Sequence, residues 1–173
     1  MKTHGDAEQK SHLRRLVLAA IFAALATLLG LFSIPVGPTK VAPFQHTINA
    51  IAGIWLGPWY AAGAALVTAA LRNSLGWGTL FAFPGSPFGA LVVGYAYRLL
   101  RRDEAALFEP LGTGPIGATI AAWVFQPQVG SHHTLWWFQV AFLSSSIPGA
   151  VLGYVVVRML RRLPAAALSA SPQ

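Results

Sequence analysis

The sequence has no cysteine and few charged residues, and both shortages limit what the protein can be. Without cysteine there is no disulfide, no thiol catalysis and no thiolate metal site. Only 10% of the 173 residues are charged, whereas a soluble domain has about a quarter. With 55% hydrophobic residues and a mean hydropathy of +0.56, the composition indicates that most of the chain lies in lipid. The apolar runs are long and rich in Ala, Leu and Gly rather than alternating, which favours helices over a closed barrel.

Acidic residues are the scarcest group in the apolar region. None occurs between Glu8 and Asp103, and Glu109 stands at the start of a predicted helix. Proton relays and cation-coupled transporters use carboxylates in the membrane, so these classes lack their usual groups. The chain has no Walker A loop, no paired carboxylates and no metal-ligand helix motif, which argues against any enzyme. The His132-His133 pair has no neighbouring carboxylate, so we expect neither a metal nor a cofactor.

Basic residues are grouped where the apolar runs end. The net charge of +7 is concentrated in three clusters, which are Arg14 and Arg15, then Arg98, Arg101 and Arg102, then Arg158, Arg161 and Arg162. Nucleic-acid binding requires such charge on one exposed face, so no nucleic-acid partner is expected. A cluster beside an apolar run is typical of cytoplasmic loops under the positive-inside rule.

Helix breakers divide the chain into segments long enough to span a bilayer, which takes roughly 20 apolar residues. We predict an all-α membrane protein with six transmembrane helices at about 13–33, 44–57, 59–72, 84–100, 113–125 and 135–160. Six spans place the three Arg clusters on one side, so both termini are predicted to be cytoplasmic. The predicted organisation is a disordered N-terminus over 1–12, a transmembrane domain over 13–162 and a flexible cytoplasmic tail over 163–173.

Polar residues gather at the predicted outer end of the second helix. Gln45 and Asn49 are four residues apart and His46 and Asn49 three, so all three can share one helix face. Polar side chains inside a membrane are unfavourable unless they pair, which makes these residues candidates for a ligand site. The alternative is that they bond only to neighbouring helices. Arg72 and Asn73 end the third helix on the same side, where Arg72 has either a structural or a ligand-binding role.

Aromatic residues dominate the other external connections. Trp77, Phe81 and Phe83 belong to a glycine-rich loop, which forms either an interfacial belt or the wall of an apolar pocket. Trp136 and Gln139 are three residues apart and can face the same cavity, although a tryptophan pair is also typical of a belt. Such a pocket is aromatic, neutral-polar and weakly basic. It suits a small, flat, uncharged or weakly anionic heterocycle.

The first predicted helix carries a strip of small residues. Ala19 and Ala23, and again Ala20 and Ala24, are four residues apart, which lets another helix approach closely. The strip serves either internal packing or the docking of a partner subunit.

Several stretches resemble the ThiW family of S-components, the substrate-binding subunits of energy-coupling factor (ECF) transporters. They are Pro43-Phe44-Gln45-His46-Thr47-Ile48-Asn49, Leu56-Gly57-Pro58-Trp59-Tyr60-Ala61, Leu71-Arg72-Asn73, Gly78-Thr79-Leu80-Phe81-Ala82-Phe83-Pro84-Gly85-Ser86 and Gly112-Thr113-Gly114. The resemblance runs from about Leu16 to Tyr154. Glu109-Pro110 departs from it, because we expect the family to have a glycine before the glutamate and no proline after it.

The resemblance implies a multi-pass subunit of a prokaryotic cytoplasmic membrane that captures hydroxyethylthiazole, a thiamin precursor, from outside. It also implies docking through the alanine strip on a membrane T-component driven by two cytoplasmic ATPases. The alternatives are an S-component for another small vitamin or heterocycle, a membrane scaffold without a ligand, and a self-sufficient transporter.

Overall fold

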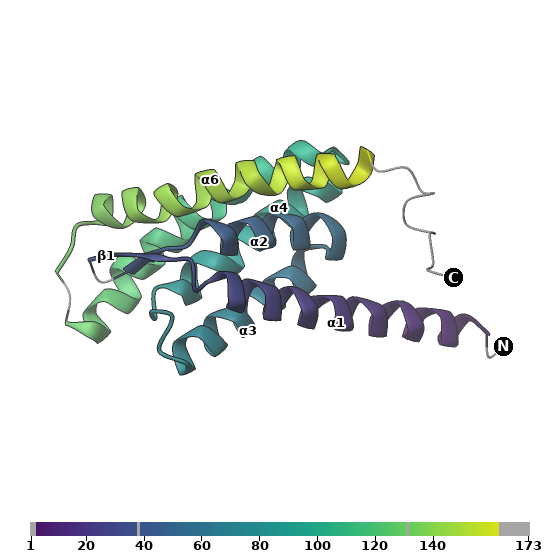
Figure 1. Cartoon of the computed structure of the whole chain (residues 1–173), viewed down its shortest axis with the longest axis horizontal. Helices are drawn as coiled ribbons and strands as arrows, with labels where there is room; N and C mark the ends of the chain where they lie inside the picture. The colour runs from purple at the N-terminus through teal and green to yellow at the C-terminus, as the bar shows by residue number, and fades with distance from the viewer. Residues whose placement is uncertain (1–2, 38, 131, 163–173) are drawn as a thin grey trace.

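The protein is a bundle of helices with one small hairpin. The computed structural model describes residues 3–37, 39–130 and 132–162. The long helices are α1 (Thr3–Leu29), α2 (Pro43–Leu56), α3 (Pro58–Ser74), α4 (Ala82–Leu100) and α6 (Leu135–Arg162). Strands β1 (Ile34–Val36) and β2 (Thr39–Val41) pair antiparallel between α1 and α2 (Figure 1). The fifth helical segment is broken into η1 (Asp103–Phe108), α5 (Glu109–Leu111), η2 (Gly112–Ala118), η3 (Ala121–Phe125) and η4 (Gln126–Val129).

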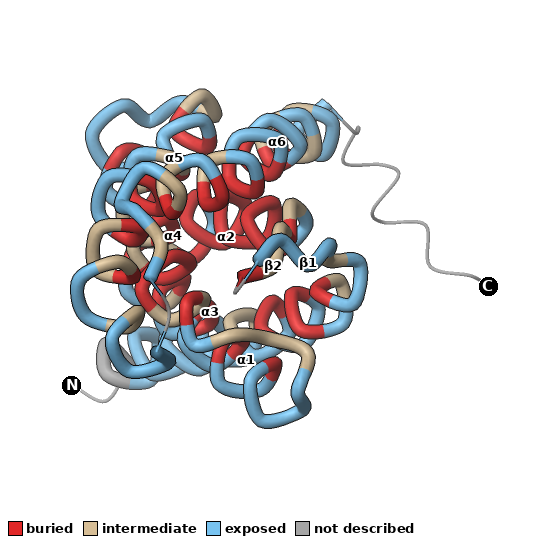
Figure 2. The backbone as a smooth tube through the Cα atoms, turned by 90° about the vertical axis from the view of Figure 1, so that its left-hand side faces the viewer, coloured by how far each residue is buried: buried red, intermediate tan, exposed pale blue. Residues whose placement is uncertain are grey.

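Helix α2 is the centre of the bundle. Eleven of its fourteen residues are buried, and it packs against α1, α3, α4 and α6 (Figure 2). Proline occupies its first position, where the missing N–H costs nothing. Gly57, at a positive φ of 83°, makes the tight turn into α3 that two consecutive long helices require. Because α2 is short and central, its first turn lies inside the bundle rather than at its edge.

The distribution of polarity is inverted relative to a soluble domain. Leu99, Trp123 and Trp136 are 83%, 72% and 75% exposed, and large apolar side chains cover the exterior of every long helix. In contrast, Arg72 and Glu109 are only 2% and 0% exposed. An apolar exterior around buried charged groups is typical of a protein that lies in lipid. Two helices in the described part of the chain, Asp6–Leu29 and Leu135–Arg162, are long and apolar enough to cross a membrane, and the count of six spans stays a prediction.

The three arginine clusters lie at the same end of the bundle. The guanidinium of Arg158 pairs with Glu104 at 3.3 Å and that of Arg161 with Asp103 at 2.9 Å, which joins the end of α6 to η1. Arg98 lies beside the α2–α3 turn at Gly57, and α1 begins at the end of the bundle where α6 finishes (Figure 1). The membrane side that this end faces stays a prediction.

Two helix starts differ most from the sequence prediction. Helix α1 begins at Thr3 rather than at the predicted start near Leu13, because Ala, Glu, Gln and Lys there are good helix formers. Helical structure in the fifth segment begins at Asp103 rather than at Thr113. Pro110 does not interrupt this helical segment, because it occupies the first turn of α5, where proline is tolerated. The predicted flexible tail over 163–173 lies outside the described residues.

Candidate functional site

A cavity lies inside the bundle where β2, the first turns of α2 and α4, the end of α3, and the middle of α6 converge. Its volume is about 40 Å³. It is lined by Thr39, Lys40, Ala42, Gln45, His46, Arg72, Gly78, Thr79, Phe81, Ala82, Gly85, Ser86, Thr113, Ala141, Phe142 and Ser145. One water needs about 10–15 Å³ by the same measure. A ring-sized ligand therefore fits only after lining side chains shift.

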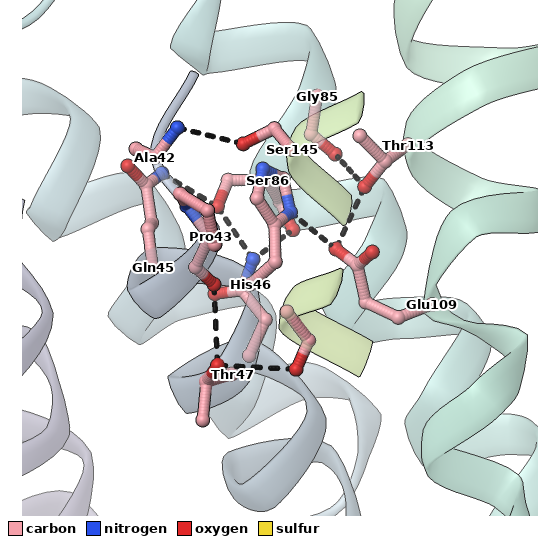
Figure 3. A network of polar contacts seen from close by, with 12 residues as sticks. Ala42, Pro43, Gln45, His46, Thr47, Gly85, Ser86, Glu109, Thr113 and Ser145 are labelled. Atoms are coloured by element: carbon pink, nitrogen blue, oxygen red, sulfur yellow. Dashed lines mark hydrogen bonds and ion pairs between the residues drawn. The ribbon is translucent and has the colours of Figure 1, made fainter. Parts of the chain in front are cut away.

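Gln45 and Asn49 converge on one hydroxyl of the neighbouring helix. The Gln45 amide Nε2 donates to Ser86 Oγ at 2.7 Å, and the Asn49 amide Nδ2 donates to the same oxygen at 2.6 Å (Figure 3). Asn49 Nδ2 also donates to the Ser86 carbonyl at 3.2 Å. The predicted common face of these two residues is confirmed. Gln45 lines the cavity, whereas Asn49 lies one turn deeper, outside the lining, and holds α2 against α4.

His46, the third residue of that face, meets a buried carboxylate. His46 Nδ1 lies 2.7 Å from Glu109 Oε1, and the Thr113 hydroxyl lies 2.7 Å from the same oxygen (Figure 3). Two glycines permit this approach. A Cβ on Gly149 would lie 2.6 Å from His46 Cβ, and a Cβ on Gly89 would lie 2.7 Å from the Glu109 carboxyl carbon.

Arg72 joins three segments at the opposite wall of the cavity. Its guanidinium donates to Gln45 Oε1, to the carbonyl of Gly30 at 3.1 Å and to that of Trp77 at 3.5 Å. The ammonium of Lys40 donates to the same Trp77 carbonyl at 2.8 Å. Two cations therefore face a cavity whose described lining contains no carboxylate, so the field inside favours ligand atoms with lone pairs.

Aromatic rings and a hydroxyl complete the cavity. Phe81 is 2% exposed and packs against Phe138 with ring centroids 5.1 Å apart. Phe142 lines the cavity from α6. Ser145, one turn further, accepts a hydrogen bond from the backbone N–H of Ala42 at 2.8 Å, which fixes the end of the hairpin against α6.

The structure brings four of the sequence-predicted residues to the cavity, namely Gln45, His46, Arg72 and Phe81. Trp77 contributes its carbonyl to the arginine and lysine, and its side chain is half-buried outside the lining. Asn73 is exposed, Phe83 and Gln139 are half-buried outside the lining, and Trp136 is on the outer face of α6. Trp136 and Gln139 were predicted to face one cavity, but α6 presents Phe138 and Phe142 to the interior instead.

The cavity also contains residues that sequence reasoning missed, which are Thr39, Lys40, Ser86, Thr113, Phe142 and Ser145, with Glu109 behind them. Signals existed for two of these residues. Lys40 and Arg72 are the only charged residues between Leu16 and Tyr97, and Glu109 is a lone carboxylate beside glycines and an apolar helix. A charged residue that interrupts an apolar stretch is a functional candidate.

The alanine strip is divided between two environments. Ala19, Ala20 and Ala23 border an apolar groove of about 380 Å³ between α1 and α3, whose other wall includes Gly63. Ala23 is 3% exposed, and its carbonyl accepts a hydrogen bond from α3, so it serves internal packing. Ala20 and Ala24 are exposed, and Ala24 lies outside the groove.

The apolar exterior and the polar internal cavity place this bundle in the class of helical membrane proteins that enclose a polar cavity. A crystal structure of the S-component for biotin from an ECF-type ABC transporter has the same fold. Its TM-score is 0.65 at 21% sequence identity, over 90% of this chain and 94% of that one. No curated protein matches the chain.

The chain belongs to the ThiW family, whose model is described as thiamine-precursor transporter protein and matches residues 16–163. The resemblance in the sequence motifs is thereby confirmed, and the chain belongs to a family of precursor transporters rather than of enzymes.

Proposed function

We propose that the protein is the substrate-capturing subunit of an ECF-type importer, and that it takes up hydroxyethylthiazole from outside a prokaryotic cytoplasmic membrane. The observation that carries the proposal is the internal cavity, in which an aromatic wall faces a set of neutral and cationic donors. The ligand has a flat apolar ring, one ring nitrogen and one hydroxyl. Phe81 and Phe142 suit the ring, and Gln45, Arg72 and His46 suit its polar atoms.

The proposal includes a topology and partners. Six spans with both termini cytoplasmic place the cavity toward the outer side, because the arginine clusters lie at the opposite end of the bundle. The groove beside Ala20 is the proposed contact for a membrane T-component, which two ATPases drive. A scaffold without a ligand is the competing function.

Thermal unfolding of the detergent-purified protein tests the proposal against a panel of vitamins and precursors. A ligand that binds only the folded state adds about 2.7 kcal/mol at 100 times its dissociation constant. For a chain of this size this amounts to a rise of about 5–10 °C. A rise with hydroxyethylthiazole supports the substrate, and a rise with another compound alone keeps the class and rejects this substrate. No rise with any compound favours the scaffold.

Substitutions in the cavity separate binding from folding. We expect His46→Ala to weaken binding by about tenfold or more, since it removes a polar contact of the cavity wall. Asn49→Ala should act more on stability, because Asn49 bonds to Ser86 behind the lining. His12→Ala is the matched control, since His12 is exposed at the opposite end beside Tyr60. Unchanged affinity in His46→Ala would place the ligand elsewhere.

A further inference from the structure

Behind the cavity wall lies a carboxylate that a ligand does not reach. Glu109 is 0% exposed and is not among the lining residues, yet its Oε1 is 2.7 Å from Nδ1 of the lining residue His46. We propose that Glu109 is a positioning residue: it holds the His46 ring with the proton on Nδ1, so that Nε2 accepts a hydrogen bond from the ligand. The inference rests on the proposed function and narrows the substrate class to small heterocycles that carry a hydrogen-bond donor.

The hydrogen-bond pattern around Glu109 places the proton. Thr113 Oγ1 donates to Glu109 Oε1 at 2.7 Å, and His46 Nδ1 meets the same oxygen at the same distance. In this proposal Glu109 Oε1 accepts both hydrogen bonds, with Thr113 Oγ1 and His46 Nδ1 as the donors. A neutral imidazole with its proton on Nδ1 has a lone pair on Nε2.

Both His46 and Glu109 are closely packed against glycines. The packing of His46 Cβ against Gly149 and the contact of Glu109 with Gly89 hold both partners in place. Nε2 lies on the ring edge away from Glu109 (Figure 3), and within the described residues it has no hydrogen-bond partner. It is therefore an unpaired acceptor on this wall of the cavity, opposite the donors Arg72 and Lys40, and within the same residues Glu109 Oε2 behind the wall is unpaired as well.

This arrangement gives the cavity hydrogen-bond donors on one side and an acceptor on the other, so it binds the two ends of a ligand differently. Arg72 and Lys40 provide only donors, which suit a ring nitrogen or another lone pair. His46 provides an acceptor, which suits a hydroxyl proton. A site built to accept a hydrogen bond discriminates against an analogue that lacks the donor, because the acceptor is then left buried and unpaired. Hydroxyethylthiazole has a donor in its hydroxyl, and its methyl ether keeps the ring and loses the donor.

The test compares these two compounds by calorimetric titration of the full chain in detergent. In the wild type we expect the alcohol to bind about tenfold more tightly than the ether. Glu109→Gln keeps an acceptor for Nδ1 and should retain this ratio. Glu109→Leu removes the acceptor and frees the ring to protonate Nε2, so the ratio should fall toward one. If the ether binds more weakly only because it is larger, the affinity ratio should stay the same in Glu109→Leu. A fall in the ratio therefore indicates that the lost hydrogen bond, not the size, weakens binding of the ether.

Nitrogen-15 spectra of the histidine-labelled wild type provide a second readout, which does not depend on the folding of a Glu109 variant. The chain has five histidines, and His46→Gln identifies the resonance of His46. The inference expects a protonated Nδ1 and an unprotonated Nε2. A protonated Nε2 in the wild type, or equal affinity for alcohol and ether, overturns the inference and leaves the proposed function standing. If neither compound binds, the proposed function fails and the inference fails with it.

Discussion

Ser86→Ala tests whether the amide cluster stabilises the bundle, because one hydroxyl accepts hydrogen bonds from two side chains. Its removal leaves Gln45 Nε2 without a partner, while Asn49 Nδ2 keeps only the Ser86 carbonyl at 3.2 Å. Both residues are 3% exposed, so bulk solvent does not replace the lost acceptor. A buried donor left unpaired costs about 1–3 kcal/mol. Between one and two such losses amount to about 2–4 kcal/mol, or about 5–15 °C in Tm for a chain of this size.

The assay is thermal unfolding of the purified protein in detergent, with Ser144→Ala as the matched control. Ser144 is also helical, but its hydroxyl bonds only to the carbonyl of Ala141 in its own helix and the residue is exposed. We expect the control to remain within about 0.5 kcal/mol of the wild type. Ser86→Ala should also weaken ligand binding, because Gln45 loses the contact that orients it in the cavity. A Tm equal to that of Ser144→Ala would refute the assignment of Ser86 as the shared acceptor.

Three further substitutions test the packing, the arginine and the groove. Gly94→Ala should lower stability by about 2–3 kcal/mol, since its Cβ would lie 2.8 Å from Pro58 Cβ and closer to the Pro58 backbone. Gly63→Ala is its control, with no atom within 4 Å of the new Cβ, and equal unfolding temperatures of the two variants would contradict the close helix approach. Arg72→Met should lower stability by about 3 kcal/mol in chemical denaturation, because the carbonyl and amide oxygens that it binds lose a charged donor. Ala20→Trp should block co-purification with a T-component yet leave ligand binding intact, and loss of binding would show that this face is internal packing.

Helical spacing predicted part of the site well. The spacing of Gln45, His46 and Asn49 was sufficient to place them on one face, since that face follows from helix geometry alone. Their partners come from residues 37 to 63 positions away in the chain. No local rule selects Ser86 from the other serines, so the destination of each hydrogen bond was not predictable.

Glu109 shows why the burial of a residue was harder to predict than its status as an unusual charged residue. Its isolation in an apolar region was visible, but the fifth helix was predicted to begin only at about Thr113, which left Glu109 at its edge. In the structure Pro110 lies in a first turn, and a Cβ on Gly112 would lie 2.7 Å from the backbone nitrogen of Gly89. The two residues that signal a break thus allow the helical segment to pack closely against α4. This packing brings the carboxylate to the level of His46.

The sequence analysis also failed to predict which face of α6 points into the bundle. Trp136 and Phe138 are both aromatic, and a helix with apolar residues around its circumference gives no periodic signal for its inner face. The structure turns Phe138 inward at 0% exposure and leaves Trp136 at 75%. The choice depends on Phe81, which packs against Phe138 and closes one wall of the cavity.

The polar residues of the cavity also determine how the helices are arranged, and this dual role has a physical reason. In a bundle whose exterior is apolar, burial of hydrocarbon distinguishes poorly between inner and outer helix faces. Hydrogen bonds and close glycine contacts then decide which faces meet. Arg72, Gln45 and Ser86 form a chain that joins α3, α2 and α4, and Arg72 extends it to the carbonyl of Gly30 after α1. A ligand that competes for Gln45 or Arg72 therefore acts on the same bonds that hold these helices together, so binding and helix packing are coupled through them.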